Sequence, residues 1–324
     1  MIESLGQMLL QAAIETGSSD LHIQPDGDHY QVSQHRAIGL VAVQQLSFEE
    51  GQQLIAHFKY RANMAITETR RPQLGAMTLS VDGQIVHLRL SSVGNFLNQE
   101  SLVMRLLLPL DVQQPKFLVP AQFQQLRQWS GLRGLILFAG PTGSGKTTTI
   151  YQLARELSAS QSVLSIEDPV EIIAPDFLQL QVNPAAEMSY QALIKVALRH
   201  RPEVLIVGEI RDHETAKAAV DAALSGHLVL SSVHAQTARG TVNRLSQLAI
   251  DQIAIEQAVI GVAYQRLLPT QTGDLAAYFD LVEGPVTADW YQQTNMTQQW
   301  KETLADAKQR SQISSATYHR FENG

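Results

Sequence analysis

The sequence predicts two domains of mixed α/β class: a small α+β domain, and a larger one in which helices cover both faces of a parallel sheet. The chain of 324 residues is long enough for two domains, and 44% of its residues are hydrophobic, so each half can bury a core. Residues 109–120 contain three prolines, which marks a boundary. Beyond them, short apolar runs alternate with helical segments, a pattern typical of a parallel sheet between two helical layers.

Residues 1–108 make up the predicted small domain. Apolar residues at helical spacing predict helices, and a period-two alternation such as Val86, Leu88 and Leu90 predicts strands. The predicted elements are helices 2–15 and 48–64 and strands 20–23, 86–91 and 102–107. A turn at Pro25-Asp26-Gly27 is expected to close the first strand. Residues 109–120 follow as a linker, because proline interrupts both helices and strand ladders.

Residues 121–324 make up the predicted larger domain. Its apolar runs predict buried parallel strands at 135–139, 163–166, 204–207 and 228–232. Helices are predicted at 147–157, 190–199, 214–224 and near 300–311. Ser189 and Asp212 suit helix N-caps, and Gly226 suits a helix stop. The residues after 311 are expected to form a polar tail that can fray.

The composition excludes several classes of protein. Lys and Arg number 24 against 31 Asp and Glu, a net charge of −7, which disfavours nucleic-acid binding through bulk charge. The chain has no cysteine, so disulfides, thiolate catalysis and Cys-ligated zinc are excluded. The N-terminus lacks the features of a secretory signal, and no window approaches the ~18 apolar residues that span a bilayer. We therefore expect a cytoplasmic protein that reaches a membrane only through a partner.

Residues 140–147 read GPTGSGKT and match the phosphate-binding pattern G-x-x-x-x-G-K-[ST] in full, between a predicted strand and a predicted helix. Glycines let backbone N–H groups turn toward a phosphate, and the helix N-terminus adds its positive dipole end. Lys146 can neutralise β- and γ-phosphate charge, and Thr147 can hold Mg²⁺. The predicted ligands are ATP and Mg²⁺. The predicted nucleotide-binding residues are Gly140, Pro141, Thr142, Gly143, Ser144, Gly145, Lys146, Thr147 and Thr148.

Acidic residues follow two of the predicted strands. Glu209 ends one apolar run, and Glu167, Asp168 and Glu171 come just after another. Because parallel strands present their carboxyl ends at the same edge as the phosphate loop, these acids are expected to face the nucleotide crevice. Like charges this close repel one another, which is tolerable if Mg²⁺ or a polarised water lies among them. The alternatives are a helix-start acid at Glu209 and a solvated acidic turn at 167–171.

Two histidines flank the fourth predicted strand. His234 follows its carboxyl end, where a group that senses the γ-phosphate is expected. His227 precedes the strand and suits a cap of the preceding helix equally well. Neither histidine has a second ligand three or four residues further on, so a metal site built on them is not expected.

Four motifs, in order and spacing, resemble those of the secretion and type IV pilus motor ATPases. The phosphate loop, SIEDPVE at 165–171, LIVGEIRD at 205–212 and GHLVLSSVHAQTA at 226–238 resemble the P-loop, aspartate box, Walker B and histidine box of that family. SSDLHIQP at 18–25 looks like its N-terminal signature, and RRPQLG at 70–75 also matches. The resemblance covers residues from about 15 to 270.

The resemblance implies a RecA-like P-loop core with a PAS-like N-terminal domain, in a hexameric ring that hydrolyses ATP to ADP and phosphate. Lys146 and Thr147 carry over as ligands of phosphate and Mg²⁺, and Glu209 carries over as the Walker B acid, also toward Mg²⁺. Glu171 carries over as the residue that activates water. The remaining residues implied are Glu167 and Asp168 beside Glu171, His227 and His234 of the histidine box, and Arg89 and Arg105, which resemble arginines that reach the γ-phosphate.

The arginine assignments rest partly on the sequence pattern itself. Arg89 lies on the strand face opposite Val86 and Leu88, so its side chain is expected to point away from their apolar side. Arg105 interrupts an apolar run, so it needs a partner, and a structural ion pair explains it nearly as well. Further candidates are Arg199, Arg211 and Arg244.

Departures from the family pattern indicate which branch is closest. The chain begins near SSDLHIQP, so the extra N-terminal domain of secretion and pilus-extension ATPases is expected to be missing, as is their tetra-cysteine zinc insertion. VIGVAYQRLL at 259–268 is closer to the QRL segment of assembly ATPases than to the retraction box. These features resemble the competence ATPases of Gram-positive DNA uptake, which assemble a short pilus or pseudopilus. Arg201 stands where many relatives have aspartate.

The resemblance also implies the partners: other copies in a homohexamer and an integral membrane platform protein, with the ring peripheral at the inner face of the membrane. Direct nucleic-acid binding is not expected. Within the family, a pilus retraction motor or a protein secretion motor is the alternative. Outside it, the alternatives are a RecA-like nucleic-acid motor, a small-molecule kinase, and an interaction protein with a vestigial nucleotide site.

Overall fold

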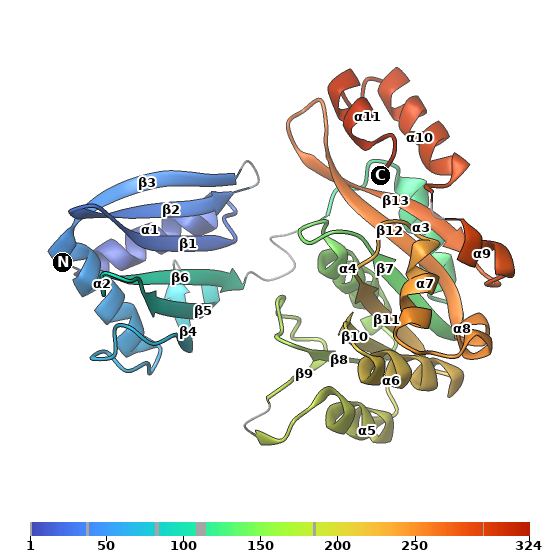
Figure 1. Ribbon diagram of the computed structural model, residues 1–324, viewed down its shortest axis with the longest axis horizontal. Coiled ribbons are helices and arrows are strands. Elements are labelled where there is room, and N and C mark those ends of the chain that lie inside the picture. The colour runs from blue at the N-terminus through green and yellow to red at the C-terminus, as the bar shows by residue number, and fades with distance from the viewer. Residues whose placement is uncertain (1, 37–38, 82–83, 108–114, 184–185, 294) are drawn as a thin grey trace. The chain divides into compact units, whose positions relative to one another are not determined.

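The computed structural model describes residues 2–36, 39–81, 84–107, 115–183, 186–293 and 295–324. The chain divides into two compact units, Met1–Leu108 and Pro109–Gly324. Figure 1 draws the first unit in blue to teal and the second in green to red. Each unit is described by itself.

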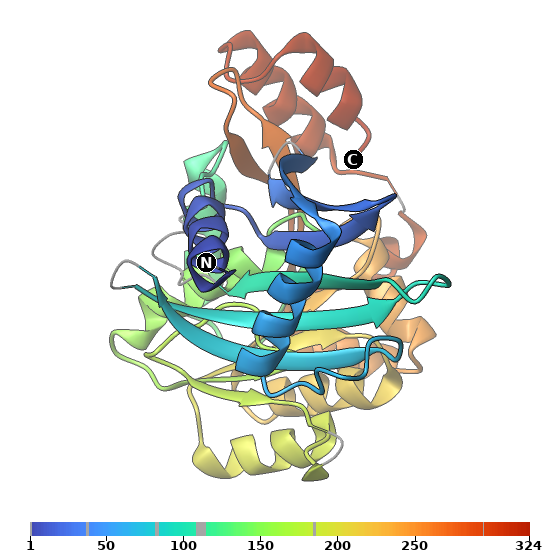
Figure 2. The ribbon, with the colours of Figure 1, turned by 90° about the vertical axis from the view of Figure 1, so that its left-hand side faces the viewer.

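The first unit is a six-stranded antiparallel sheet with two helices. The sheet order is β3-β2-β1-β6-β5-β4. Its elements are α1 (Ile2–Glu15), β1 (Asp20–Asp26), β2 (His29–Arg36), β3 (Gly39–Ser47), α2 (Phe48–Arg61), β4 (Gln73–Val81), β5 (Gln84–Gly94) and β6 (Glu100–Leu107). Leu21, Leu88 and Met104 belong to one buried cluster with Leu10 of α1 and Phe58 of α2, so the helices cover one face of the sheet. Figure 2 shows α2 lying across that face.

Several expectations for this unit need correction. The first strand continues through Pro25 to Asp26 instead of ending at 23. Three strands, β2, β3 and β4, were not predicted. β2 mixes polar and apolar residues yet buries Ser33 and Gln34 as well as Val32, and β3 and β4 are the two edges of the sheet, where few positions are buried.

The second unit is a seven-stranded sheet in the order β13-β12-β7-β11-β10-β8-β9. Neighbouring strands pair in parallel, except that β13 runs antiparallel to β12. The strands are β7 (Gly134–Ala139), β8 (Val163–Glu167), β9 (Leu178–Gln181), β10 (Val204–Ile210), β11 (Leu228–Val233), β12 (Val259–Pro269) and β13 (Leu275–Glu283). The prediction of a parallel α/β core is confirmed.

Helices cover both faces of this sheet. They are α3 (Pro120–Trp129), α4 (Lys146–Ser158), α5 (Tyr190–His200), α6 (His213–Leu224), α7 (Gly240–Gln247), α8 (Gln252–Ala258), α9 (Ala288–Gln292), α10 (Gln298–Gln309) and α11 (Ser315–Phe321). Ile136 and Phe138 of β7 pack in one cluster with α3 and α4. Leu135 and Leu137 of the same strand pack in a second cluster with the remaining helices. β7 is therefore apolar on both faces, which explains its uninterrupted apolar run.

The helix ends follow local chemistry. The Ser189 and Asp212 side chains accept hydrogen bonds from the backbones of Ala192 and Thr215, as expected of N-caps. Gly226 has φ +92°, a left-handed conformation that suits a residue just past a helix.

Two expectations at the ends of this unit need correction. Of the predicted linker 109–120, residues 109–114 lie outside the described residues, while Lys116 and Leu118 bond to the backbone of Ala277 in β13 and α3 begins at Pro120. The predicted fraying tail instead contains α11, with Phe321 4% exposed. The Trp300 indole donates to the Phe321 carbonyl at 2.9 Å, so α10 and α11 are bonded together. Within the described residues, no helix combines the length and the apolar character needed to cross a bilayer.

Candidate phosphate-binding site

Residues 140–145 form a tight loop between β7 and α4. Gly140, Gly143 and Gly145 have φ values of +141°, +76° and +81°, a region that favours glycine. A Cβ atom on Gly140 would lie 2.4 Å from the carbonyl oxygen of Gln265, so the loop also needs glycine there for close packing. Since α4 begins at Lys146, the loop leads directly into a helix N-terminus, whose unpaired N–H groups suit an anion.

Lys146 is buried at the base of this loop. Its Nζ donates to the carbonyl oxygens of Gly140 and Pro141, at 2.9 Å each. Burial lowers the pKa of Lys146, while the charges of Glu209 and Glu171 act in the opposite direction. The ammonium group is therefore held inside the curve of the loop, next to two carboxylates.

Glu171 approaches the start of α4 from the segment that follows β8. The Thr147 hydroxyl donates to Glu171 Oε2 at 3.2 Å. This contact joins the predicted Mg²⁺ ligand to the residue predicted to activate water. The structure thus brings the two residues together at the first turn of α4.

Glu209 lies between two basic side chains at the carboxyl end of β10. Arg211 donates to its Oε2 at 2.7 Å, and His234 Nε2 lies 3.1 Å from its Oε1. His234 Nδ1 lies 3.2 Å from the carbonyl oxygen of Gly140. The carbonyl and the carboxylate both accept, so each contact is a hydrogen bond when the ring nitrogen that faces it carries a proton. His234 thereby connects Glu209 to the phosphate loop.

A bulge in β10 sets the direction of Glu209. The register of β10 against β11 shifts between Val207 and Glu209, and Ser232 Oγ donates to the Gly208 carbonyl at 2.8 Å. A Cβ on Gly208 would lie 3.1 Å from the Tyr190 hydroxyl and 3.3 Å from Glu167 Cα. A side chain at 208 would therefore crowd Tyr190 and the end of β8, and these groups would have to shift by a few tenths of an ångström to admit it.

Glu167 is buried behind the loop segment that carries Glu171. Its carboxylate accepts from the hydroxyls of Tyr151 and Ser165, and burial raises its pKa. The neighbouring Asp168 faces Tyr190, whose pKa is raised by burial and then by the Asp168 charge. The Glu171 charge acts on Glu167 in the same direction as burial, but Glu167 is bonded to the interior of the domain, and a role for Glu167 and Asp168 beside Glu171 stays a prediction.

His227 lies away from the phosphate loop and from the acids around it. Its Nδ1 lies 3.1 Å from the Ala222 carbonyl at the end of α6, and its own carbonyl accepts from Gly134 at the start of β7. The start of β7 is the edge of the sheet opposite the phosphate loop. His227 thus caps α6, the alternative considered from the sequence, and its role at a subunit contact stays a prediction.

The two predicted arginines face each other in the first unit. Arg89 of β5 and Arg105 of β6 are register partners, and Arg105 is also opposite Asp20 of β1. Arg105 Nε donates to Asp20 Oδ1 at 2.8 Å, so the expected ion pair is present. The Arg105 side chain is 56% exposed, which leaves part of the guanidinium accessible. That either arginine reaches a phosphate stays a prediction.

The donor set fits Mg²⁺ bound together with a nucleotide. Thr147, Glu171 and Glu209 offer hard oxygen ligands, the type Mg²⁺ prefers. Among the described residues there is no cluster of three or more His, Cys, Asp or Glu side chains that would hold a metal alone. Mg²⁺ typically completes its octahedron with phosphate oxygens and water, so this site needs few protein ligands.

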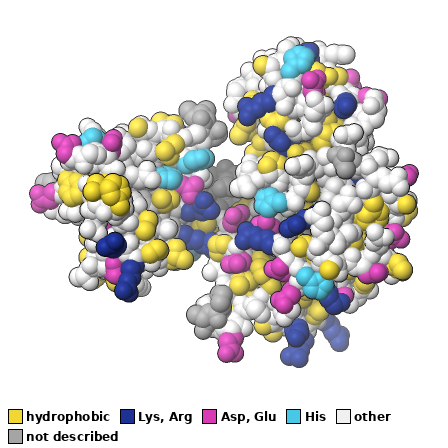
Figure 3. Space-filling view, in the orientation of Figure 1, with side chains coloured by type: hydrophobic (Ala, Val, Ile, Leu, Met, Phe, Trp, Pro, Cys, Tyr) yellow, Lys and Arg dark blue, Asp and Glu magenta, His cyan; other side chains and the backbone are white. Residues whose placement is uncertain are grey.

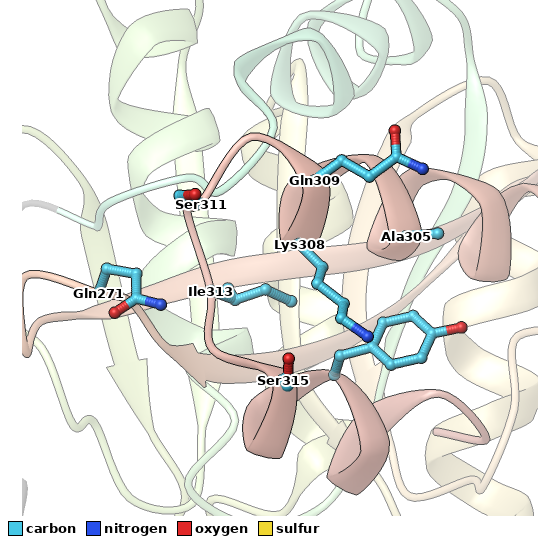
Figure 4. Close-up of a pocket in the computed structure, with 8 residues that line it drawn as sticks. Gln271, Ala305, Lys308, Gln309, Ser311, Ile313 and Ser315 are labelled. Carbon is cyan, nitrogen blue, oxygen red and sulfur yellow. The ribbon is translucent and has the colours of Figure 1, made fainter.

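A cavity of about 420 Å³ lies elsewhere in the second unit, between the β12–β13 turn and helices α10 and α11. Figure 4 shows Gln271 on one side and Lys308 and Ser315 on the other. Lys308 Nζ lies 4.6 Å from the centre of the Tyr318 ring. The cavity's lining contains no acid and no glycine-rich loop, and we assign no chemistry to it.

Comparison with known proteins places this site in a family. The family described as "Type II/IV secretion system protein" matches residues 1–317. "Competence protein ComGA" of Streptococcus pneumoniae is 42% identical over 268 residues, which cover 83% of this chain and 85% of that protein.

Solved structures agree with the fold. The ATPase DotB of Legionella pneumophila has a TM-score of 0.78 at 21% identity, and covers 96% of this chain and 93% of its own. The pilus retraction motor PilT, solved with bound ADP, has a TM-score of 0.72 at 24% identity, with 97% and 96% covered. This chain thus has the same fold as DotB and PilT over most of its length.

Proposed function

The chain belongs to the type II/IV secretion system ATPase family and hydrolyses ATP, and from this premise we propose that it is one subunit of a hexameric motor. The motor drives assembly of a competence pilus or pseudopilus for DNA uptake. The similarity to a competence protein over most of both chains supports this branch of the family. We propose that the ring acts at the inner face of the membrane, against an integral membrane platform protein.

The proposed chemistry rests on one observation: the phosphate loop, Glu171, Glu209 and His234 meet at one edge of the sheet. Lys146 and the loop N–H groups hold the β- and γ-phosphates. Thr147 and Glu209 would hold Mg²⁺, which neutralises phosphate charge when bound. Glu171 orients the attacking water. His234 contacts both the Gly140 carbonyl and Glu209, so a change in the conformation of the loop would change the contact that His234 makes with Glu209.

Arg89 and Arg105 are the proposed source of additional positive charge. We propose that residues 1–108 move about the proline-containing segment and bring these arginines to the γ-phosphate of a site in the ring. Such arginine contacts are typically worth roughly 10³–10⁵ in rate. The alternation between open and closed arrangements would convert hydrolysis into motion, provided that the two states differ in nucleotide affinity.

A retraction or secretion motor of the same family shares this chemistry and remains the second candidate. A nucleic-acid motor is less well supported. On the face of the second unit drawn in Figure 3, Lys and Arg side chains lie in small groups among Asp and Glu side chains. Together with the net charge of −7, this arrangement lacks the continuous basic groove of proteins that bind single strands.

The test is steady-state ATP hydrolysis by three variants. Lys146→Ala removes the buried ammonium, and Glu171→Gln removes the carboxylate beside Thr147, so both are expected to lose most turnover, by at least about 100-fold. Arg89→Ala is expected to bind nucleotide normally and lose turnover.

The matched control is Lys195→Ala, because Lys195 is an exposed lysine on α5. This variant should hydrolyse ATP at the wild-type rate. Wild-type turnover in both Lys146→Ala and Glu171→Gln contradicts the assigned site. Wild-type turnover in Arg89→Ala contradicts only the role of the arginine.

A further inference from the structure

Strand β12 carries side chains of two kinds on its two faces. Tyr264 and Leu268 belong to the cluster that includes α10 and α11, and Arg266 lies over the Phe321 ring at 5.0 Å. Gln265 and Leu267 point the other way, toward the phosphate loop. β12 therefore lies between the phosphate loop and the C-terminal helices α10 and α11, and contacts both.

Gln265 is the polar residue of this strand that touches the loop. Its Nε2 donates to the carbonyl oxygen of Ser144 at 2.7 Å, and the residue is 1% exposed. A Cβ on Gly145 would lie 3.0 Å from the same Nε2, and a Cβ on Gly140 would lie 2.4 Å from the Gln265 carbonyl oxygen. One residue thus lies against the first residue of the loop and against its last two.

The register of the sheet makes this contact possible. β12 pairs in parallel with β7, with Tyr264 opposite Ala139, so Gln265 comes next to Gly140, where the loop begins. β7 and α4 bound the loop on its two chain ends, and the side of the loop at Ser144 receives its support from β12.

The Gln265 amide is retained at an energetic penalty. Its Oε1 is buried and, among the described residues, has no hydrogen-bond partner, and the same is true of the nearby Ser144 Oγ. An unpartnered buried polar atom destabilises a fold. An aliphatic side chain would remove the unpartnered oxygen but would also leave the Ser144 carbonyl without its donor, so the Gln265 amide is tied to the backbone of the loop.

We propose that Gln265 is a positioning residue for ATP hydrolysis: its amide fixes the Ser144 peptide and so aims the loop N–H groups at the β-phosphate. This inference rests on the proposed phosphate site. Gln265 does not touch the reacting atoms. It acts through the backbone of the loop, from a strand about 120 residues further along the chain.

The experiment compares Gln265→Met with Gln122→Met. Methionine keeps the length and approximate volume of the side chain but removes the amide. Gln122 is a matched control, because it is 6% exposed and its Nε2 donates to a strand carbonyl, that of Phe279, at 2.6 Å, away from the phosphate loop. Each variant is assayed for kcat, for KM of ATP, for the dissociation constant of a fluorescent ADP, and for melting temperature.

We expect Gln265→Met to lower kcat/KM by about tenfold to a hundredfold and to weaken ADP binding, as a misplaced loop would. Gln122→Met is expected to lower the melting temperature while kcat and KM stay at wild-type values. Gln265→Asn provides a second variant, which keeps an amide but is too short to reach Ser144, and it should share the kinetic defect.

Wild-type kcat/KM in Gln265→Met and Gln265→Asn would overturn the inference. It is also overturned if both methionine variants lose activity in proportion to their loss of melting temperature, since that result indicates a structural role alone. Lys146→Ala separates the two claims. If Lys146→Ala is inactive while the Gln265 variants are normal, the phosphate site stands and only the role of Gln265 is wrong; if Lys146→Ala is fully active, the site itself is wrong.

Discussion

At the scale of single residues, Glu209 makes two polar contacts that other groups could replace. Both of its oxygens are engaged, one by Arg211 and the other by His234. The side chains of Arg211 and His234 are 63% and 48% exposed, so water screens both interactions. Screened pairs of this kind contribute little stability, which leaves Glu209 free to change partners when a cation or a phosphate approaches.

Asp280 on β13 provides a prediction about pH. It is 1% exposed, and it accepts hydrogen bonds from the backbone and hydroxyl of Thr297, the N-cap of α10. Burial raises its pKa above the ordinary value of 3.8. The folded state therefore binds the Asp280 proton more tightly than the unfolded state, and this contribution to stability is lost as pH rises through the folded-state pKa. Urea unfolding of the wild type and Asp280→Asn between pH 4 and pH 7 should show the wild type losing stability relative to the variant.

Asp176→Asn serves as the comparison, because Asp176 is an exposed acid on the same unit. It gives the effect of replacing an acid by an amide at an exposed position, against which the Asp280→Asn series is compared. A stability difference between the wild type and Asp280→Asn that does not change with pH, or a wild type that gains stability relative to the variant as pH rises, would contradict the assignment.

Site residues could be predicted from the sequence where the signal lies within a short stretch of the chain. The phosphate loop, Glu171, Glu209 and His234 could be predicted because each sits in a contiguous motif or at a strand end, and strand ends of a parallel sheet share an edge. Gln265 and Tyr190 could not, because their contacts depend on which strands are neighbours. A polar residue inside the apolar run 259–268 was the available signal for Gln265.

At the scale of elements, α11 is the clearest case of a segment held by tertiary packing. It is a seven-residue helix, too short to be stable alone. Its N-cap Ser314 accepts from Thr317, and Phe321 packs into the main cluster beneath Arg266. We expect Phe321→Ala to reduce the free energy of unfolding by about 3 kcal/mol, as measured by urea denaturation.

His319→Ala is the control for this prediction, because the His319 side chain on the same helix is 64% exposed. It should change the free energy of unfolding by less than about 0.5 kcal/mol. An equal effect of the two substitutions would mean that α11 is not packed as described.

The predictability of an element followed its burial pattern. β7, β8, β10 and β11 were predicted because both of their faces are buried, and a parallel strand then reads as an unbroken apolar run. β9 has no buried residue and lies at the sheet edge, so its four residues carry no such signal. α11 was missed because, of the two residues that it buries, Thr317 and Phe321, only Phe321 is hydrophobic, so the helix carries no apolar period.

At the scale of the whole molecule, each of the two units has buried clusters of its own, one cluster in the first unit and two in the second. The proposed motor needs such independence, because one unit must move while the other holds nucleotide. We expect a non-hydrolysable ATP analogue with Mg²⁺ to promote a species of six times the chain mass of 35.8 kDa, measured by light scattering after size exclusion.

The Lys146→Ala variant should fail to respond to the analogue while keeping the wild-type melting temperature within a few degrees. A chain that stays monomeric with saturating analogue would contradict the hexamer. A hexamer that forms equally well in the Lys146→Ala variant would show that assembly does not depend on the phosphate loop.

The two carbonyl oxygens that receive the Lys146 ammonium have a thermodynamic consequence for a machine that cycles. An ammonium group has three N–H donors, so a triphosphate that enters the loop competes with these two carbonyls for them, and the net binding free energy is the difference between two sets of contacts. When product leaves, the Lys146 ammonium can bond again to the carbonyls of Gly140 and Pro141, so it is not left as a buried charge without hydrogen-bond partners. The two carbonyls that weaken nucleotide binding therefore also favour product release, and product release is often the rate-limiting step of an enzyme's cycle.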